Sequence, residues 1–464
     1  MQKVIQKFEQ DWELHLNDLK ELIKIPSISF EGFDKKSVLD CGHKVADLLK
    51  ARGLENVKFL EIPNANPFVY GDWLHAKGKP TVLMYAHYDV QPIGQKNLWN
   101  TEPFEPTLLK GPGGERLYAR GAADDKAGII AQTAAIHSYL ESLGELPVNI
   151  KIIVEGEEEI GSPNLDRFLQ QYKDLFAADV ILLSDTSNFD VGIPALTVSL
   201  RGLLGFEIEV RSLKNTVHSG MWGGPTPDPA MALSKLLSTL INKDGRVAVK
   251  EINKLVPKLT SAEKKFLRET PYHEKVFRHQ LGIVKKAKLF FKKHEIWESL
   301  WRKPSISINA MQVASRSQAG NVINDTAWAR VTLRLAPGMP VAKSREALVR
   351  HFKKNAQWGL DVKISWEEGN SGWAADPKIY ETKAFKAAEK ALTLGYGKKP
   401  VKMGCGGSIP FVKQFVQLLK GAPALLVGVE DPYTNAHGEN ESLCVSDFKK
   451  SCLSQIFLLH ELSK

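Results

Sequence analysis

The chain has 464 residues, of which 43% are hydrophobic and 25% are charged. This composition is typical of a folded globular protein and excludes collagen-like, disordered and disulfide-scaffold classes. The length exceeds what one hydrophobic core usually serves, so we expect two domains. A net charge of +9 is compatible with polyanion binding, but no zinc-finger spacing, aromatic RNA-binding motif or basic tail supports it, and we expect no nucleic-acid partner.

The chain shows no signal for export or membrane insertion. No stretch approaches the roughly 20 consecutive apolar residues of a membrane-spanning helix, and the first residues lack the apolar block of a signal peptide. The four cysteines have no CxxC spacing, which fits a reducing compartment and argues against a thiolate zinc site. We therefore expect a soluble, cytoplasmic protein without membrane contact.

Apolar residues at three- and four-residue spacing in the first 24 residues predict one amphipathic helix, ended by Pro26. Short apolar runs and helical stretches then alternate, which is typical of a mostly parallel sheet covered by helices. In chain order we expect a strand at 81–86, a helix at 129–143, a strand at 148–154, a helix at 165–176 and a strand at 180–183.

After residue 200 the pattern becomes β-α-β-β-α-β, which predicts a small ferredoxin-like domain. Its expected strands are 206–210, 306–313, 327–335 and 362–366, and its expected helices are 229–240 and 341–354. The α/β pattern resumes near Tyr380. The sequence therefore predicts a first domain made of residues 1–199 and 372–464, interrupted by a second domain at 200–371.

A lysine-rich stretch at 243–303 fits neither repeating element of the second domain, so we interpret it as an insertion. Its densest basic run, residues 285–293, has a helix-like pattern around Leu289, Phe290 and Phe291. A solvated amphipathic helix explains this run better than a polyanion site.

Polar residues follow each expected strand of the first domain. They are His87 and Asp89, the acidic segment Glu155 to Glu159, Asp185 and His437, with Asp124 just before a helix. In an open α/β sheet, ligands bind beyond the carboxyl ends of the strands. We therefore expect these histidines and carboxylates to converge on one edge.

Converging carboxylates repel one another, and a divalent metal removes that cost. Two histidines with Asp and Glu form a ligand set that suits Zn²⁺ first, with Co²⁺ or Mn²⁺ as alternatives, and this many candidates indicate two ions bridged by a carboxylate. Asp89 is placed to orient the second nitrogen of His87. The alternatives are a helix cap for Asp124, an acidic surface loop for Glu155 to Glu159 and ordinary surface histidines.

Seven ordered motifs carry a family resemblance. They are HYDVQP (87–92), GAADDKAG (121–128), EGEEEIGS (155–162), Ser184-Asp185, VHSG (217–220), GGSIP (406–410) and NAHGENE (435–441). The set resembles the di-metal aminopeptidase-like family, which includes carnosinase-like dipeptidases, aminoacylases, desuccinylases and glutamate carboxypeptidases. The resemblance implies an α/β catalytic domain with a mostly parallel sheet and an inserted ferredoxin-like domain for lid closure and dimerisation.

The resemblance also implies roles for individual residues. Asp124 looks like the carboxylate that bridges two divalent metals, with His87 and Asp185 on one ion and Glu159 and His437 on the other. Glu158 looks like the general base, with Asp89 beside it in the catalytic set, and the Asp124–Asp125 peptide bond is expected to be cis. His218 resembles the family's oxyanion donor, often supplied across a dimer interface; the alternative is a turn histidine in the glycine-rich stretch 215–224.

The expected substrate is a dipeptide or short peptide with a free carboxylate. Arg334, Gly407 and Ser408, together with Asn321, resemble the family's carboxylate-binding residues, and a guanidinium fork with backbone N–H groups suits that anion. The insertion at 243–303 resembles the lid of carnosinase-like dipeptidases, whereas Cys405 and Asn324 depart from their pattern. The alternatives are an N-acyl-amino-acid amidohydrolase, a glutamate-type carboxypeptidase or, more distantly, a non-catalytic binding protein.

Overall fold

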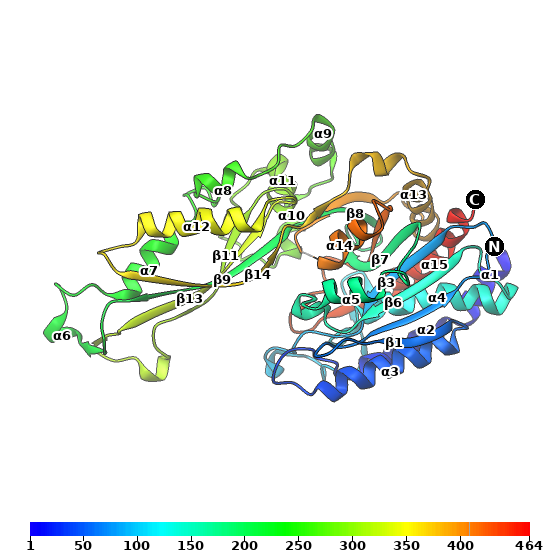
Figure 1. Ribbon diagram of the computed structural model, residues 1–464, viewed down its shortest axis with the longest axis horizontal. Helices are drawn as coiled ribbons and strands as arrows, with labels where there is room; N and C mark the ends of the chain where they lie inside the picture. The colour runs from blue at the N-terminus through cyan, green and yellow to red at the C-terminus, as the bar shows by residue number, and fades with distance from the viewer. Residues whose placement is uncertain (408) are drawn as a thin grey trace. The chain divides into compact units, whose positions relative to one another are not determined.

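The computed structural model describes residues 1–407 and 409–464 (Figure 1). The chain forms two compact units. The first contains residues 1–198, 375–403 and 409–464, and the second contains 199–374 and 404–408. Within the described residues, no helix is both long enough and apolar enough to cross a membrane.

A mixed sheet forms the centre of the first unit. Its strands lie in the order β1 (Glu55–Leu60), β2 (Phe68–Trp73), β6 (Asn149–Glu155), β3 (Thr81–His87), β7 (Val180–Ser187), β17 (Ala424–Glu430) and β8 (Ala195–Leu200). The middle strands β6, β3, β7 and β17 run parallel, while the strand pairs at both edges are antiparallel. The expected mostly parallel α/β architecture is confirmed for this centre, where nearly every residue of β3 is buried.

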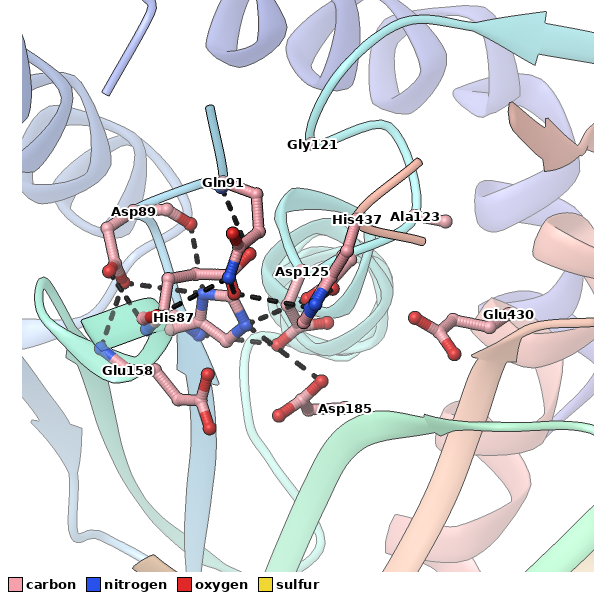
Figure 2. A network of polar contacts seen from close by, with 12 residues as sticks. His87, Asp89, Gln91, Gly121, Ala123, Asp125, Glu158, Asp185, Glu430 and His437 are labelled. Carbon is pink, nitrogen blue, oxygen red and sulfur yellow. Dashed lines mark hydrogen bonds and ion pairs between the residues drawn. The ribbon is translucent and has the colours of Figure 1, made fainter. Parts of the chain in front are cut away.

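Helices cover this sheet. The main ones are α3 (Lys35–Ala51), α4 (Lys126–Leu143), α5 (Leu165–Tyr172), α13 (Lys383–Tyr396), α14 (Pro410–Leu418) and α15 (Val445–Leu462). Helix α4 is buried on nearly all sides because its sequence is apolar or small around its whole circumference, and it packs between β3 and α15. Its N-terminus lies directly behind the carboxyl end of β3, where the polar residues gather (Figure 2).

The N-terminal segment differs from the single helix expected. Helix α1 (Gln2–Gln10) and helix α2 (Trp12–Ile23) are separated at Asp11, whose ψ of 9° leaves the helical range. The Asp11 carboxylate accepts hydrogen bonds from His137 on α4 at 3.0 Å and pairs with Lys7 at 3.1 Å. These contacts hold the break against the first unit's core, and the apolar spacing, which continues through the break, does not reveal it.

Smaller elements complete the first unit. They are the three-stranded sheet of β4 (Thr107–Gly111), β5 (Gly114–Tyr118) and β18 (Ser442–Cys444), and the 3₁₀ turns η1 (Lys96–Leu98), η2 (Glu158–Ile160) and η5 (Pro377–Glu381). Strand β16 (Val401–Cys405) pairs with β8, and its last two residues belong to the second unit. Turn η2 matters for the site, because it directly follows β6 and presents the acidic segment at the carboxyl end of that strand.

The second unit is built on a four-stranded antiparallel sheet. Its order is β11 (Ser305–Gln312), β13 (Thr326–Leu335), β9 (Gly202–Arg211) and β14 (Asp361–Asn370). Helices α7 (Pro229–Ser238) and α12 (Val341–Asn355) pack against it. Numbered by their place in the unit, the strands lie in the order 2-3-1-4, which is the ferredoxin-like arrangement that the β-α-β-β-α-β pattern predicts. Small elements beside the sheet are β10 (Val217–His218), α6 (Ser219–Trp222), η4 (Arg316–Gln318) and β12 (Val322–Ile323). Strand β15 (Trp373–Ala374) instead pairs antiparallel with the end of β8.

The insertion contains short helices: α8 (Lys250–Lys254), α9 (Ser261–Glu269), α10 (Glu274–Gln280), η3 (Lys293–Glu295) and α11 (Ile296–Trp301). The prediction of a helix for its basic run is wrong, because residues 281–292 form turns and irregular chain. Gly282 takes a φ of +64° just after α10, and Arg278 donates to the carbonyls of Val284, Lys285 and Ala287. Those bonds hold a loop that sequence periodicity does not encode.

Candidate metal centre

His87, Asp124 and Asp185 form the first of two groups of metal-ligand atoms in the first unit (Figure 2). His87 ends β3, Asp185 lies in β7, and Asp124 lies in the loop before α4. The His87 Nε2 atom lies 3.1 Å from Asp124 Oδ1 and 3.9 Å from Asp185 Oδ1. One ligand atom from each residue falls within 4.8 Å of the others, which is close enough to surround one ion.

Asp124, Glu159 and His437 form the second group. The His437 Nε2 atom lies 3.0 Å from Asp124 Oδ2 and 3.3 Å from Glu159 Oε2. Asp124 is thus common to both groups and directs one carboxylate oxygen toward each histidine. The structure does not support the helix-cap alternative for Asp124, because α4 has Asp125 at its N-cap position and no side-chain cap.

The electrostatics of this metal-ligand cluster, the five residues His87, Asp124, Glu159, Asp185 and His437, fit a divalent cation. Burial, followed by repulsion from Asp125, raises the pKa of Asp185 well above its usual value. Burial and repulsion from Asp124 do the same to the pKa of Glu159. Buried carboxylates in mutual repulsion are costly unless a cation neutralises them. Neutral imidazoles and carboxylates are also the donor set that first-row divalent metals accept.

The pKa values of the two histidines also indicate that the cluster favours positive charge. Burial lowers the pKa of His437, but the hydrogen bond to Asp124 and the negative charges of Asp124, Glu159 and Glu430 together outweigh burial and raise the pKa to about 10. His87 follows the same pattern, with a pKa well above its usual value. Without a metal, a proton on each ring supplies charge that the carboxylates need. Metal ligation requires the neutral rings, so ion binding replaces those protons.

Asp89 holds the acidic turn in place. We expected its carboxylate to orient His87, but the Nδ1 atom of His87 lies nearer the Asp89 carbonyl oxygen, at 3.0 Å, than its Oδ1, at 3.4 Å. The carboxylate accepts backbone N–H groups of Glu158 at 3.2 Å and Glu159 at 3.1 Å, and the Ser29 hydroxyl at 2.7 Å. Asp89 therefore supports the histidine through its backbone and positions the turn through its side chain.

Two further residues support the metal-ligand cluster without having been assigned a role from the sequence. Gln91 donates its side-chain amide to Glu159 Oε2 at 2.7 Å, and its backbone N–H to Oε1 at 3.1 Å. Glu441 is fully buried and accepts the backbone N–H groups of Gly121, Ala123 and Asp124 at 3.0 to 3.1 Å. Both lie inside the quoted motifs HYDVQP and NAHGENE, so the motifs were the available signal.

Glu158 lies in η2, one residue before Glu159, and its carboxylate extends beside His87 and Asp185 (Figure 2). Burial raises its pKa to about 7. Such a carboxyl is poised to exchange protons near neutral pH. The Asp124–Asp125 peptide bond is cis, as the resemblance implies. Gly128 is needed behind it, because a Cβ there would lie 2.2 Å from Asp125 Oδ1.

The remaining expected site residues belong to the second unit. His218 is exposed and caps α6: its Nδ1 accepts the N–H groups of Gly220 at 3.0 Å and Met221 at 3.3 Å. A neutral ring with an accepting Nδ1 carries its proton on Nε2 and can donate there. The carbonyl of the exposed Asn321 accepts the N–H of Ser219 at 2.9 Å. His218 therefore has the local hydrogen bonds expected of a turn histidine. The same bonds leave the Nε2–H of a neutral ring available as a hydrogen-bond donor.

Arg334 lies on β13, and burial lowers its pKa. The backbone N–H of Gly407 points to the sulfur of Cys405 at 3.3 Å. Ser408 lies outside the described residues. Three of the four residues expected to bind a carboxylate, Arg334, Gly407 and Asn321, therefore fall in the described part of the second unit.

Comparisons with known proteins agree with this geometry. A family model described as Peptidase family M20/M25/M40 matches residues 83–454. The chain is 31% identical over 384 residues to Cysteinylglycine-S-conjugate dipeptidase of Corynebacterium striatum, covering 82% of this chain and 81% of that protein. It is 29% identical over 466 residues to Beta-Ala-His dipeptidase of Homo sapiens, covering 96% and 89% of the two chains. The structure of the dipeptidase Dug1p from Saccharomyces cerevisiae matches with a TM-score of 0.89 and 26% identity, covering 100% of this chain and 98% of that chain.

The fold and the paired ligand groups define a metallopeptidase with a dinuclear divalent metal site. The chain belongs to peptidase family M20/M25/M40, and carnosinase-like and Cys-Gly dipeptidases are among its relatives. The resemblance found in the sequence motifs is confirmed.

Proposed function

We propose that this protein is a dinuclear metal-dependent dipeptidase that hydrolyses the amide bond of dipeptides or short peptides with a free C-terminal carboxylate. The observation that carries the proposal is the sharing of Asp124 between two ligand groups, with the Glu158 carboxylate beside them. The names of the relatives support dipeptides as the substrate class.

The roles of the residues follow from their positions. His87 and Asp185 would hold one ion, Glu159 and His437 would hold the other, and Asp124, which is common to both groups, would contribute to both. When bound, the two cations lower the pKa of a water molecule and polarise the scissile carbonyl. Glu158 takes the proton of the attacking water and returns it to the leaving amine. His218 donates from Nε2 to the oxyanion.

The substrate carboxylate is bound by Arg334, with the Gly407 and Ser408 loop and Asn321 around it. Support for this assignment comes from Arg334, which has no ion pair with any carboxylate of the described residues although it is partly buried. A guanidinium in that state is completed by an anionic ligand. An N-acyl amino acid offers the same carboxylate, so a deacylase is the competing function within the same site.

Three finer features belong to the same proposal. Zn²⁺ is the preferred metal, because the ligand set is nitrogen and oxygen without sulfur. The protein works as a homodimer formed through the second unit, where Met221 and Trp222 next to His218 are 75% and 56% exposed. The protein works in the cytoplasm, since a chain with so few cysteines, none in CxxC spacing, suits a reducing compartment.

The decisive experiment combines metal removal with a substrate panel. Chelated protein should lose hydrolysis of dipeptides and regain it with Zn²⁺, Co²⁺ or Mn²⁺. The panel should contain dipeptides, their C-terminal amides, and N-acetyl and N-succinyl amino acids. Activity that survives complete metal removal would rule out the dinuclear mechanism. Faster hydrolysis of the N-acyl amino acids than of any dipeptide would replace the dipeptidase assignment by a deacylase.

A further inference from the structure

Two guanidinium groups of the second unit meet without a carboxylate to neutralise them. Arg201 follows β8 and is only 7% exposed, and Arg334 lies on β13. Arg201 Nη1 donates to the Ser305 hydroxyl at 2.9 Å, and Ser305 is the cross-strand partner of Arg334. Neither arginine forms an ion pair with a carboxylate in the described part of the chain. We call Arg201 and Arg334 the arginine pair.

No carboxylate of the described residues compensates the charge of the arginine pair, and the pKa of Arg201 is lowered as a result of burial and of the neighbouring charge. Burial, followed by repulsion from Arg334, lowers the pKa of Arg201 to about 10. Both guanidiniums remain charged at neutral pH. A buried cation left with neutral hydrogen-bond acceptors is costly, so the arrangement points to an anion as its missing partner.

The Cys405 side chain, on the glycine-rich loop, lies close enough to both arginines to interact with them electrostatically. Arg201 donates its backbone N–H to the Cys405 carbonyl at 3.2 Å and its Nε to the Gly406 carbonyl at 3.2 Å. The Cys405 sulfur in turn accepts the N–H of Gly407 at 3.3 Å. Nearby cations and a backbone N–H directed at sulfur favour the thiolate, which is the reactive form of cysteine.

Cys405 also differs from the other cysteines in access. Cys41, Cys444 and Cys452 are 0% exposed, whereas Cys405 is partly exposed. Burial also raises the pKa of Cys452, which keeps that thiol unreactive. The chain therefore contains one accessible thiol beside an unneutralised pair of cations and three internal controls.

We propose that Cys405 is a modification site, at which its sulfur forms a mixed disulfide with small disulfides that carry carboxylates, with the arginine pair binding the carboxylates of the incoming molecule. The Cys405 thiolate attacks one sulfur of the disulfide, and a bond forms between the two sulfurs. The disulfide bond of the reagent breaks, and its other half leaves as a thiolate. The protein thiol is oxidised, one half of the reagent is reduced, and a thiol reductant reverses the step.

The test uses the full-length protein and two aromatic disulfides, the dicarboxylate dithionitrobenzoate and the uncharged dipyridyl disulfide. Without denaturant, one thiol per chain should react rapidly with the dicarboxylate, and mass spectrometry should locate the modification at Cys405. Added salt should slow the dicarboxylate and leave the uncharged reagent unaffected. Arg334→Gln should slow the dicarboxylate reaction about tenfold, because the local field concentrates the anion.

Arg330→Gln is the matched control. Arg330 lies on the same strand, but its charge is already paired with Glu367 at 2.7 Å, so its loss should leave both reaction rates unchanged. Modification located at Cys41, Cys444 or Cys452 would overturn the proposal. So would equal salt dependence for the two reagents, or equal slowing by the Arg334 and Arg330 variants. The mapping is done on the unmutated chain, so it does not depend on how well a cysteine variant folds.

A consequence for hydrolysis rests on the proposed function: the mixed disulfide should raise KM for free dipeptides until a reductant removes it. The thiol reaction is followed by released thiolate and by mass, without any hydrolysis. A chain that is modified at Cys405 but hydrolyses no dipeptide would overturn the proposed function and leave the modification site standing. An active dipeptidase whose Cys405 stays unmodified would overturn the modification site and leave the proposed function standing.

Discussion

The metal-ligand cluster of the first unit gathers negative charge, whereas the arginine pair of the second unit gathers positive charge, and their surroundings differ. Around the cluster, Asp89, Gln91 and Glu441 fix the ligand loops through hydrogen bonds. Around the arginine pair, Arg201 donates to two neutral acceptors, the Ser305 hydroxyl and the Gly406 carbonyl, and neither arginine pairs with a carboxylate of the described residues. The first site is therefore preorganised for cations, and the second keeps its charge available for an anion. Substitutions should thus act on turnover and metal binding in the first unit, and on substrate binding in the second.

Glu158→Gln should have the largest effect. The amide cannot take a proton from water, so turnover on dipeptides should fall by roughly 10² to 10⁴-fold while the metal content stays the same. Steady-state kinetics together with metal analysis of the purified variant measures both quantities.

Glu157→Gln is the control for this substitution. Glu157 is the neighbour of Glu158, but its carboxylate accepts the backbone N–H groups of Asn66 and Asn164 at 3.2 and 3.1 Å. Its loss should change stability more than turnover. Equal losses of turnover in the two variants would mean that Glu158 acts through the shape of the turn and not as a base.

The metal-free protein should lose stability as pH rises. Burial raises the pKa of Glu158 to about 7 and that of Glu155 to about 8. A carboxyl whose folded-state pKa is raised contributes stability below its unfolded pKa, and this contribution is lost as pH rises through the folded value. The raised pKa of His437, about 10, acts in the same direction between its ordinary value and pH 10. Metals need the deprotonated ligands, so the gap in Tm between metal-loaded and metal-free protein should widen with pH.

Calorimetry of both forms across the pH range measures that gap. Each proton that the folded, metal-free form keeps and the unfolded chain has lost lowers the free energy of unfolding by roughly 1.4 kcal/mol per pH unit. Glu155→Gln serves as the control, because Glu155 lies outside the metal-ligand cluster, where its carboxylate accepts the Tyr85 hydroxyl at 2.8 Å. The substitution should reduce the change of Tm with pH by the same amount in the metal-loaded and the metal-free protein. A gap that is constant or narrows with pH would contradict the protonation of the ligands in the metal-free protein.

Glu441→Gln should weaken metal binding without touching a metal ligand. Its carboxylate accepts Arg120 at 2.7 Å and the loop N–H groups that lead to Asp124. An amide would place N–H groups against donors and loosen that loop, so metal affinity should fall by about 10 to 100-fold. Titration of the metal-free protein with Zn²⁺ measures the change. Glu439 is a partly exposed neighbour that accepts the Gln95 N–H at 3.0 Å, so Glu439→Gln should leave affinity unchanged.

Much of the first unit was predictable because one rule connects sequence to position there. Polar residues after buried parallel strands meet at one sheet edge, and the structure places His87, Asp124, Glu159, Asp185 and His437 together in this way. The bonds of Asp89 were not predictable, since spacing cannot tell whether a carboxylate or its own carbonyl faces a histidine. The loop at residues 281–292 was predicted as a helix because its apolar spacing favours one. In the structure Arg278 donates to backbone carbonyls of this segment and stabilises a loop instead.

The arginine pair was missed for a related reason. Arg334 was predicted to bind a carboxylate, but Arg201, which follows β8, had no assigned role, and the two residues lie far apart in sequence. Only the register that places Ser305 opposite Arg334 brings them together. A sequence signal for long-range pairing of like charges does not exist in periodicity or spacing. The balance of charge around a site therefore has to be found in the folded chain.

Arg334→Ala should have the smallest effect of these substitutions on catalysis, and it bears most directly on the comparison. If Arg334 binds the substrate carboxylate, KM for free dipeptides should rise about tenfold with little change in kcat, because that contact is equal in ground and transition states. C-terminal amides of the same dipeptides should be hydrolysed equally well by the variant and the parent. Arg330→Ala, which removes a cation already paired with Glu367, should leave both KM values unchanged. Equal loss on free and amidated dipeptides would show that Arg334 supports the strand and not the substrate. The uncompensated charge of the second unit would then have to be explained by Arg201 alone.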